Sequence, residues 1–236
     1  MISLTDLTKY YGSTRALRIP SLTIEDSRIV GLLGENGAGK TTLLKALTGV
    51  TAYGGQIRID GCTPREKYAE MAFITEEGSW FGFMTPAAFG DFLADFFPHF
   101  LSARYKTLLE FFELPEHTPI RTFSKGQQAK LEVAAGFSKG AKYIFMDEPF
   151  LGKDIFTRRD FLKLMASSLH GEETILLSTH QVEEIERFLD EAIILHRGEV
   201  VSQQGLDEIH AQGLSLVERM QQATGYDPER YQKFTF

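Results

Sequence analysis

Short apolar runs of strand length recur along the chain, separated by longer segments with helical spacing. Ile29–Leu33, Lys142–Asp147 and Thr174–Ser178 are such runs, and their composition is typical of strands buried on both faces. A helix is expected between the last two, which would then form a parallel βαβ unit. The pattern predicts an α/β fold with a mainly parallel core sheet.

The N-terminal part carries a different pattern. Ile2–Leu4 and Leu17–Ile24 are predicted to be strands on either side of the turn-like Tyr11–Ser13, and Gln56–Gly61 alternates polar and apolar residues as a half-exposed strand does. Strands joined by a tight turn run antiparallel. We therefore expect an N-terminal antiparallel β part beside the core sheet.

Helical spacing dominates the middle and the end of the chain. A short helix is predicted from Pro64 to Met71, followed by a strand at Ala72–Thr75. Strand signals then fade, which predicts an inserted α-helical subdomain over about 85–140. A hairpin is predicted at Glu191–Ser202 and a helical tail over about 205–236. No linker separates these parts, so residues 1–236 are expected to form a single domain.

Charge and apolar content exclude several classes of protein. The formal net charge of −7 creates no basic surface field, so we expect no nucleic-acid partner. The single cysteine, Cys62, cannot form an internal disulfide and fits a reducing compartment. No run approaches the roughly 18 apolar residues that a membrane-spanning helix needs, and the N-terminus lacks the pattern of a signal peptide. A cytoplasmic location is expected.

A glycine-rich stretch follows the first buried run and leads into a helix that ends near Gly49. It fits the pattern G-x-x-x-x-G-K-[ST], in which a strand, a glycine-rich turn and a helix together build a phosphate site, the P-loop. The candidates for nucleotide contacts are Gly34, Glu35, Asn36, Gly37, Ala38, Gly39, Lys40, Thr41 and Thr42.

The residue types give the P-loop its chemistry. Gly34, Gly37 and Gly39 permit backbone conformations and close approaches that a Cβ would obstruct. Successive N–H groups can then surround a phosphate at the positive end of the helix. Lys40 is a candidate for the β- and γ-phosphates, and the Thr41 hydroxyl is a candidate ligand for Mg²⁺. We expect a nucleoside triphosphate here; the alternative is a glycine-rich turn with a purely structural role.

Polar residues follow two of the predicted core strands. In open α/β sheets, ligands bind beyond the carboxyl ends of the strands. Asp147 is assigned to Mg²⁺, directly or through water, and Glu148 to polarising the attacking water, because adjacent residues of an extended chain point in different directions. His180 follows Thr174–Ser178, where it could hydrogen-bond a γ-phosphate or that water. The alternatives are a strand terminus and a structural histidine.

Together with Phe123–Gln127, which reads Phe-Ser-Lys-Gly-Gln, these motifs resemble those of the ATP-binding subunit of ABC transporters. The resemblance runs from Tyr11 to about Ser202, in the family's order and spacing. It is greatest for the small single-domain ATPases of bacterial drug and antibiotic-peptide exporters. It implies an ATPase that powers a separate integral-membrane permease and has Lys40, Glu148 and His180 as its catalytic residues. The permease would hold this ATPase at the inner face of the cell membrane.

The resemblance also implies roles outside the P-loop. Tyr11 would stack on adenine, and its neighbour Tyr10 is the alternative. Phe123–Gln127 corresponds to the family's signature loop, whose Ser124, Gly126 and Gln127 would contact the nucleotide held by an opposite subunit. Two ATP molecules would then lie between two ATPase subunits arranged head to tail, as a homodimer or a heterodimer.

Three positions depart from the family's pattern. Glu76 stands where a glutamine is usual, and an ionised carboxylate can approach Mg²⁺ or water but cannot donate to a phosphate oxygen. Lys125 replaces the first glycine of the signature loop. Phe150–Asp154 is bulkier than the usual loop, whose aspartate, here Asp154, would lie at the dimer interface. Hydrolysis is still expected, because the catalytic residues remain.

Large aromatic residues crowd the segment after Glu76. Trp80, Phe81 and Phe83 are predicted to lie in a loop, where several exposed apolar side chains mark a binding surface. In the family, the cleft beside this loop receives a short helix of the membrane subunit.

Two rival functions remain: a soluble ABC-type ATPase acting on ribosomes or DNA, and a nucleotide-dependent sensor or immunity module. The first generally has two cassettes or a long coiled-coil insertion, which this sequence does not show.

Overall fold

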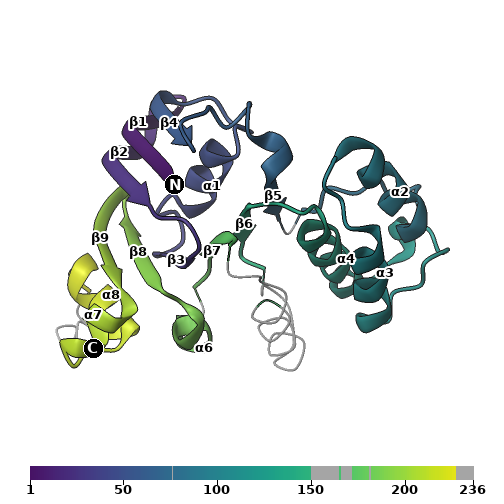
Figure 1. Cartoon of the computed structure of the whole chain (residues 1–236). Coiled ribbons are helices and arrows are strands. Elements are labelled where there is room, and N and C mark those ends of the chain that lie inside the picture. The colour runs from purple at the N-terminus through teal and green to yellow at the C-terminus, as the bar shows by residue number, and fades with distance from the viewer. Residues whose placement is uncertain (76, 150–164, 166–171, 181, 227–236) are drawn as a thin grey trace, which may run out of the picture.

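The computed structural model describes residues 1–75, 77–149, 165, 172–180 and 182–226. Its centre is a six-stranded sheet with the strand order β5-β6-β7-β3-β8-β9 (Figure 1). The strands of this sheet are β3 (Ile29–Leu33), β5 (Met71–Ile74), β6 (Tyr143–Asp147), β7 (Thr174–Ser178), β8 (Glu191–His196) and β9 (Glu199–Gly205). All neighbours pair in parallel except β8 and β9. The predicted α/β fold with a mainly parallel core sheet is confirmed.

Both faces of this sheet are buried. Successive side chains of a strand point to opposite faces, and in β6 Tyr143 and Phe145 join one apolar core while Ile144 and Met146 join another. The first core lies between the sheet and α1 (Lys40–Leu47), the helix of the P-loop. The continuous apolar runs of the sequence are thus explained by two cores that share the same strands.

The N-terminal sheet is antiparallel, with the order β2-β1-β4. Its strands are β1 (Ile2–Tyr11), β2 (Thr14–Ile24) and β4 (Gly54–Ile59), and Ile2 pairs with both Ile24 and Ile59. The predicted antiparallel part is therefore confirmed. β1 extends well beyond the predicted Ile2–Leu4, because its polar residues face outward while they remain paired in the ladder.

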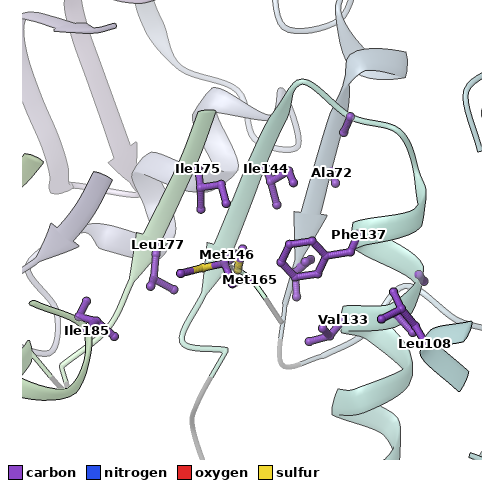
Figure 2. Close-up of a cluster of buried hydrophobic side chains, with 14 of the residues drawn as sticks. Ala72, Leu108, Val133, Phe137, Ile144, Met146, Met165, Ile175, Leu177 and Ile185 are labelled. Carbon is purple, nitrogen blue, oxygen red and sulfur yellow. The ribbon is translucent and has the colours of Figure 1, made fainter. Parts of the chain in front are cut away.

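Three helices form a lobe at one side of the core sheet (Figure 1). They are α2 (Pro86–Phe96), α3 (Ser102–Phe111) and α4 (Lys125–Ser138), and a single 3₁₀ turn, η2 (Ile120–Thr122), precedes α4. Figure 2 shows Phe137 and Val133 extending from α4 toward the strands that carry Ala72, Ile144 and Met146. The helices predicted over about 85–140 are present, and one continuous core joins them to the sheet.

The helix predicted from Pro64 to Met71 is wrong. The segment forms turns and a 3₁₀ turn, η1 (Tyr68–Glu70), and Met71 already belongs to β5, where it pairs with Tyr143. The Glu66 carboxylate accepts hydrogen bonds from the backbone N–H and hydroxyl of Thr63. This local bond starts a helical turn, but the pairing of β5 ends it before a helix can grow.

The C-terminal tail consists of two short helices as far as Thr224, and residues 227–236 lie outside the described residues. α6 (Val182–Ile185) and the 3₁₀ turn η3 (Glu186–Phe188) precede the β8–β9 hairpin, and α7 (Leu206–Ala211) and α8 (Leu216–Thr224) follow it. The hairpin predicted at Glu191–Ser202 is confirmed, although β9 is longer. The helix predicted between β6 and β7 lies outside the described residues, except at Met165. Within the described part of the chain, every helix is too short or too polar to cross a bilayer.

Candidate active site

The P-loop connects β3 to α1, which begins at Lys40 as predicted. Two glycines in it have left-handed backbone conformations and tight surroundings. A Cβ at Gly34, where φ is 152°, would lie 2.4 Å from the Leu195 backbone oxygen. At Gly39, where φ is 108°, it would lie 2.8 Å from the Leu17 side chain. Glycine is therefore required at both positions.

The Lys40 side chain turns back onto this loop and is almost fully buried. Its Nζ donates to the backbone oxygens of Gly34 at 2.8 Å and of Glu35 at 3.2 Å. The same Nζ lies 3.8 Å from Oε1 of Glu148. The ammonium group is thus held in a fixed place by acceptors that an incoming phosphate would compete with.

A hollow of about 280 Å³ opens over the P-loop. The described residues that line it come from the strands β1 and β2, the turn after β3, the start of α1 and the residue after β6: Tyr11, Ala16, Asn36, Gly37, Gly39, Lys40, Thr41, Thr42 and Glu148. Tyr11 is half-exposed at this hollow, with Lys9 Nζ 4.8 Å from the centre of its ring. Tyr10 is also exposed but does not line the hollow.

The backbone turns sharply where β6 ends. Glu148 has a φ of 46°, a left-handed conformation that costs a non-glycine residue about 1–2 kcal/mol. Its backbone N–H approaches both the carbonyl oxygen and the Oγ of Ser178 on β7, each at 3.1 Å. These bonds hold the turn. Asp147 and Glu148 do point differently, but the reason is this left-handed turn and not the extended chain that we predicted.

Asp147 is fixed by the neighbouring strand. β6 and β7 pair in parallel with Asp147 opposite Ser178, whose hydroxyl donates to Asp147 Oδ1 at 2.6 Å. Ser178 was not among the predicted site residues. The available signal was that two adjacent core strands both end in polar residues, since the carboxyl ends of parallel strands meet at one edge of the sheet.

His180 contacts Glu148, the carboxylate that is predicted to be catalytic. Its Nδ1 lies 3.0 Å from Glu148 Oε2, and about half of the side chain is exposed. An ionised carboxylate can only accept a hydrogen bond, so Nδ1 is the donor of this bond. Lys40, Glu148 and His180 therefore form one chain of polar contacts, with Glu148 at its centre.

Oxygen donors that suit Mg²⁺ lie beside this chain of contacts. The Thr41 hydroxyl is exposed at the hollow and makes no hydrogen bond to any described residue. Asp147 uses one carboxylate oxygen for Ser178 and has a second. Mg²⁺ prefers oxygen ligands and retains several waters, so the residues present fit this ion.

The signature loop lies at the start of α4 and does not reach this hollow. Ser124 is the N-cap of α4: its Oγ accepts from the Gln127 N–H at 3.2 Å, and its own N–H donates to Gln127 Oε1 at 2.9 Å. Ser124, Lys125 and Gly126 are exposed. No residue of the loop is among the described residues that line the hollow.

Two predicted positions lie outside the described residues: Glu76 and the loop Phe150–Asp154. Among the P-loop residues, Ala38 is buried, with its N–H 3.1 Å from the Glu35 oxygen. Glu35 instead lines, with His180, a second hollow of about 490 Å³ beside α8. Gly34 and His180 do not line the P-loop hollow but contact Lys40 and Glu148, which do. Asp147 does not line it either and directly precedes Glu148.

A mainly parallel sheet with a P-loop after β3 and two carboxylates after β6 defines a P-loop NTPase. The family model described as ABC transporter matches residues 17–151, more than half of the chain. The ABC transporter ATP-binding protein YtrB of Bacillus subtilis is 31% identical over 222 residues, which cover 92% of this chain and 76% of YtrB. This chain belongs to the ABC transporter ATP-binding family, whose members bind and hydrolyse ATP.

Two further similarities are as extensive. The Nod factor export ATP-binding protein I of Ralstonia nicotianae is 30% identical over 244 residues, which cover 92% of this chain and 72% of that protein. A solved structure described as the ATP binding subunit of an ABC transporter has a TM-score of 0.86 and 28% identity, and covers 94% of this chain and 99% of its own.

Proposed function

We propose that this chain binds and hydrolyses ATP in order to power a separate membrane permease, and that the transporter is an exporter. One observation carries the enzymatic part: Lys40 and Glu148 lie close together at the hollow that the P-loop lines, and His180 contacts Glu148. The export direction is supported by the similarity to an export ATP-binding protein. In this proposal the protein works in the cytoplasm, attached to the membrane through the permease.

Each residue at or next to the P-loop hollow has a distinct task in this proposal. Lys40 binds the β- and γ-phosphates, and Thr41 and Asp147 hold Mg²⁺, which when bound neutralises the charge that develops on the phosphates. Glu148 accepts a hydrogen bond from the attacking water and orients it. His180 positions the Glu148 carboxylate through Nδ1. Tyr11 is exposed where it can stack on adenine.

A second subunit completes the site. The signature loop does not reach the P-loop hollow of its own chain, but its donors are exposed. The Ser124 hydroxyl accepts a hydrogen bond within the helix cap, and its O–H is still available to donate to a phosphate of the opposite subunit. The N–H groups of Lys125 and Gly126 begin α4 and favour an anion at that position. We therefore infer a head-to-tail dimer that holds two ATP molecules.

The decisive variant for hydrolysis is Glu148→Gln. It keeps the size of the side chain but replaces the negatively charged acceptor, so turnover should fall by about 10²–10⁴-fold while ATP still binds. With Mg²⁺ and ATP, the variant should accumulate as a dimer in size-exclusion chromatography. Glu183→Gln, a change at an exposed glutamate on α6, is the control and should behave as the parent. Near-normal turnover of Glu148→Gln would refute the role of Glu148.

The permease contact is proposed for a cluster of aromatic side chains that lie on α2 and on the segment before it. The rings of Phe81 and Phe92 pack edge-to-face with their centroids 5.5 Å apart. The ring centroids of Phe92 and Phe96 are 4.6 Å apart, and those of Phe81 and Phe83 are 5.8 Å apart. Phe81, Phe83 and Phe96 are all exposed, and Phe83 is 73% accessible. Exposed aromatic groups gathered in this way mark a protein or membrane contact. Trp80 instead packs against the core.

Phe83→Asp tests this contact. Because Phe83 is so exposed, the fold should be unaffected, while an unpaired charge in an apolar interface should weaken binding of the permease by about tenfold or more. Co-purification from cells and ATPase rates with and without the permease measure the effect. Tyr68→Asp, a change at another exposed aromatic residue, is the control. Unchanged assembly, or ATPase activity that no membrane protein alters, would favour a soluble ATPase or a sensor.

A further inference from the structure

A buried carboxylate on α4 is unused by the proposed ATP chemistry. Glu132 is 2% exposed, and its Oε2 accepts from Ser79 twice, from the backbone N–H at 2.8 Å and from the hydroxyl at 3.0 Å. The backbone of Thr75 also hydrogen-bonds it. Ser79 lies in the segment of residues 77–84, here called the aromatic loop, which carries Trp80, Phe81 and Phe83. Glu132 thus holds the start of this loop on α4.

Burial of the Glu132 carboxylate costs free energy, because it removes a group that can be charged from water. Burial raises the pKa of Glu132, and the hydrogen bonds from Ser79 and the charge of Lys139 oppose that rise. A buried charged group that serves only packing can often be replaced by an apolar side chain without loss. Glu132 lines neither the P-loop hollow nor the hollow beside α8. Its contacts therefore point to a task in fixing the aromatic loop.

The C-terminal end of the aromatic loop is hydrogen-bonded as well, to residues that precede the signature loop. The Ile120 N–H donates to the Met84 oxygen at 2.9 Å, and the Arg121 N–H donates to the Gly82 oxygen at 2.9 Å. Ile120 and Arg121 belong to η2, which ends just before Phe123–Gln127. The aromatic loop is hence bonded to the residues that precede the signature loop and to the helix that follows it.

We propose that Glu132 is a positioning residue that joins the aromatic loop to α4, so that Phe83 and Ser124 move as one unit. The inference rests on the proposed function, in which Phe83 meets the permease and Ser124 meets the phosphate of the opposite subunit. A permease bound at the aromatic loop then sets the position of the phosphate clamp. Coupling between two sites is reciprocal, so ATP engaged by Ser124 must also stabilise the aromatic loop.

The reciprocal effect can be measured without a permease. In the Glu148→Gln background, amide hydrogen exchange is followed with and without Mg²⁺ and ATP in peptides that cover residues 77–84 and residues 118–127. Glu132→Leu removes the acceptors, and Glu132→Gln retains an oxygen that can accept both bonds from Ser79. Ser138→Ala is the matched control, because it deletes a buried hydrogen bond to Ala134 on the same helix without touching the loop. ATPase kcat and KM are measured for the same three changes with Glu148 intact.

In the parent, ATP should slow exchange in both peptides. In Glu132→Leu, the peptide of the signature loop should still respond. The aromatic loop should exchange about tenfold faster and lose most of its response to ATP, because only its bonds to η2 remain. Because a phosphate clamp that is held less precisely loses interactions made in the transition state, kcat should fall by about fivefold or more, with KM for ATP unchanged. Glu132→Gln should restore both the response and kcat, and Ser138→Ala should leave both as in the parent.

Three results would overturn the role of Glu132: a normal ATP response of the aromatic loop in Glu132→Leu, no recovery in Glu132→Gln, or an equal loss in Ser138→Ala. If Glu132→Leu does not fold, Ser79→Ala removes one of the two Ser79 bonds and must give a smaller loss of the same kind. If ATP produces no dimer and slows neither peptide in the parent, the proposed function fails, and the inference fails with it. A dimer that forms while the aromatic loop never responds refutes the inference alone.

Discussion

The P-loop half of the proposed ATP site and its signature-loop half differ in how the chain holds their polar groups. Lys40, Glu148 and His180 contact one another, and Lys40 is bonded to carbonyl oxygens of its own loop. Ser124 and Gly126 are exposed, and the bonds of Ser124 stay within the cap of its own helix. Folding of one chain therefore brings the polar groups of the P-loop half into contact with one another, whereas it leaves those of the signature-loop half exposed at the surface.

The difference separates two kinds of contribution to the reaction. Groups that the fold holds at fixed distances require no reorganisation when substrate arrives, so the P-loop half should bind ATP in a single subunit. Donors at the exposed start of a helix gain their target only when another molecule presents one. The signature-loop half should therefore affect dimer closure and turnover, and leave the first binding step unchanged.

The largest effect is expected in the P-loop half. Lys40→Met removes the charge that faces the phosphates, so kcat/KM should fall by about 10²–10³-fold, and ATP binding to the isolated subunit should weaken as well. Titration with ATP and a steady-state ATPase assay measure both quantities. Lys45→Met, on the same helix but away from the hollow, is the control. Intact ATP binding by the Lys40 variant would show that the P-loop half is not the part that binds nucleotide alone.

A smaller effect with a different signature is expected for Ser124→Ala. The lost hydrogen bond to a charged phosphate should lower kcat by about 10–100-fold, with ATP binding to the single subunit unchanged. The change also removes a helix cap worth about 1 kcal/mol of stability. Ser215→Ala removes the same type of capping box from α8, so thermal unfolding should report similar losses for both variants. Equal activities of the two variants would mean that Ser124 acts only as a cap.

The smallest effect is expected for Ser178→Ala, which sharpens the comparison within the P-loop half. It deletes the hydrogen bond that Ser178 Oγ donates to Asp147 and the one that it accepts from the Glu148 N–H, so both carboxylates are held less firmly. We expect kcat to fall by about tenfold or less and the Mg²⁺ concentration for half-maximal activity to rise. Ser202→Ala, at a buried serine on β9, is the control. Wild-type kinetics would show that the strand pairing alone positions Asp147.

The sequence predicted those features whose determinants are contiguous. The P-loop carries its own geometry in a few successive residues, and the apolar runs reveal strands buried on both faces. The bond from Ser178 to Asp147 depends on the register of β6 against β7, which joins residues distant in sequence. The left-handed turn at Glu148 depends on the same pairing.

Tertiary contacts also override or conceal local signals. The bond between Thr63 and Glu66 marks a helix start, yet the pairing of β5 ends the turn at Met71. Glu132 lies among apolar residues of a helix, and no local pattern distinguishes it from a solvated charge. Its hydrogen bonds to the aromatic loop form only when the fold brings Ser79 next to it.

The capping box at Ser124 places two requirements on one atom. An aspartate caps a helix as well as a serine does, so a protein engineer who sought a more stable α4 would consider it an equivalent choice. Its carboxylate, however, has no hydrogen to donate and would set a negative charge against the phosphate that the proposed dimer brings to this point. Helix stability and catalysis thus restrict the choice to a small hydroxyl residue, and any gain in thermal stability for this lobe must be sought at other positions.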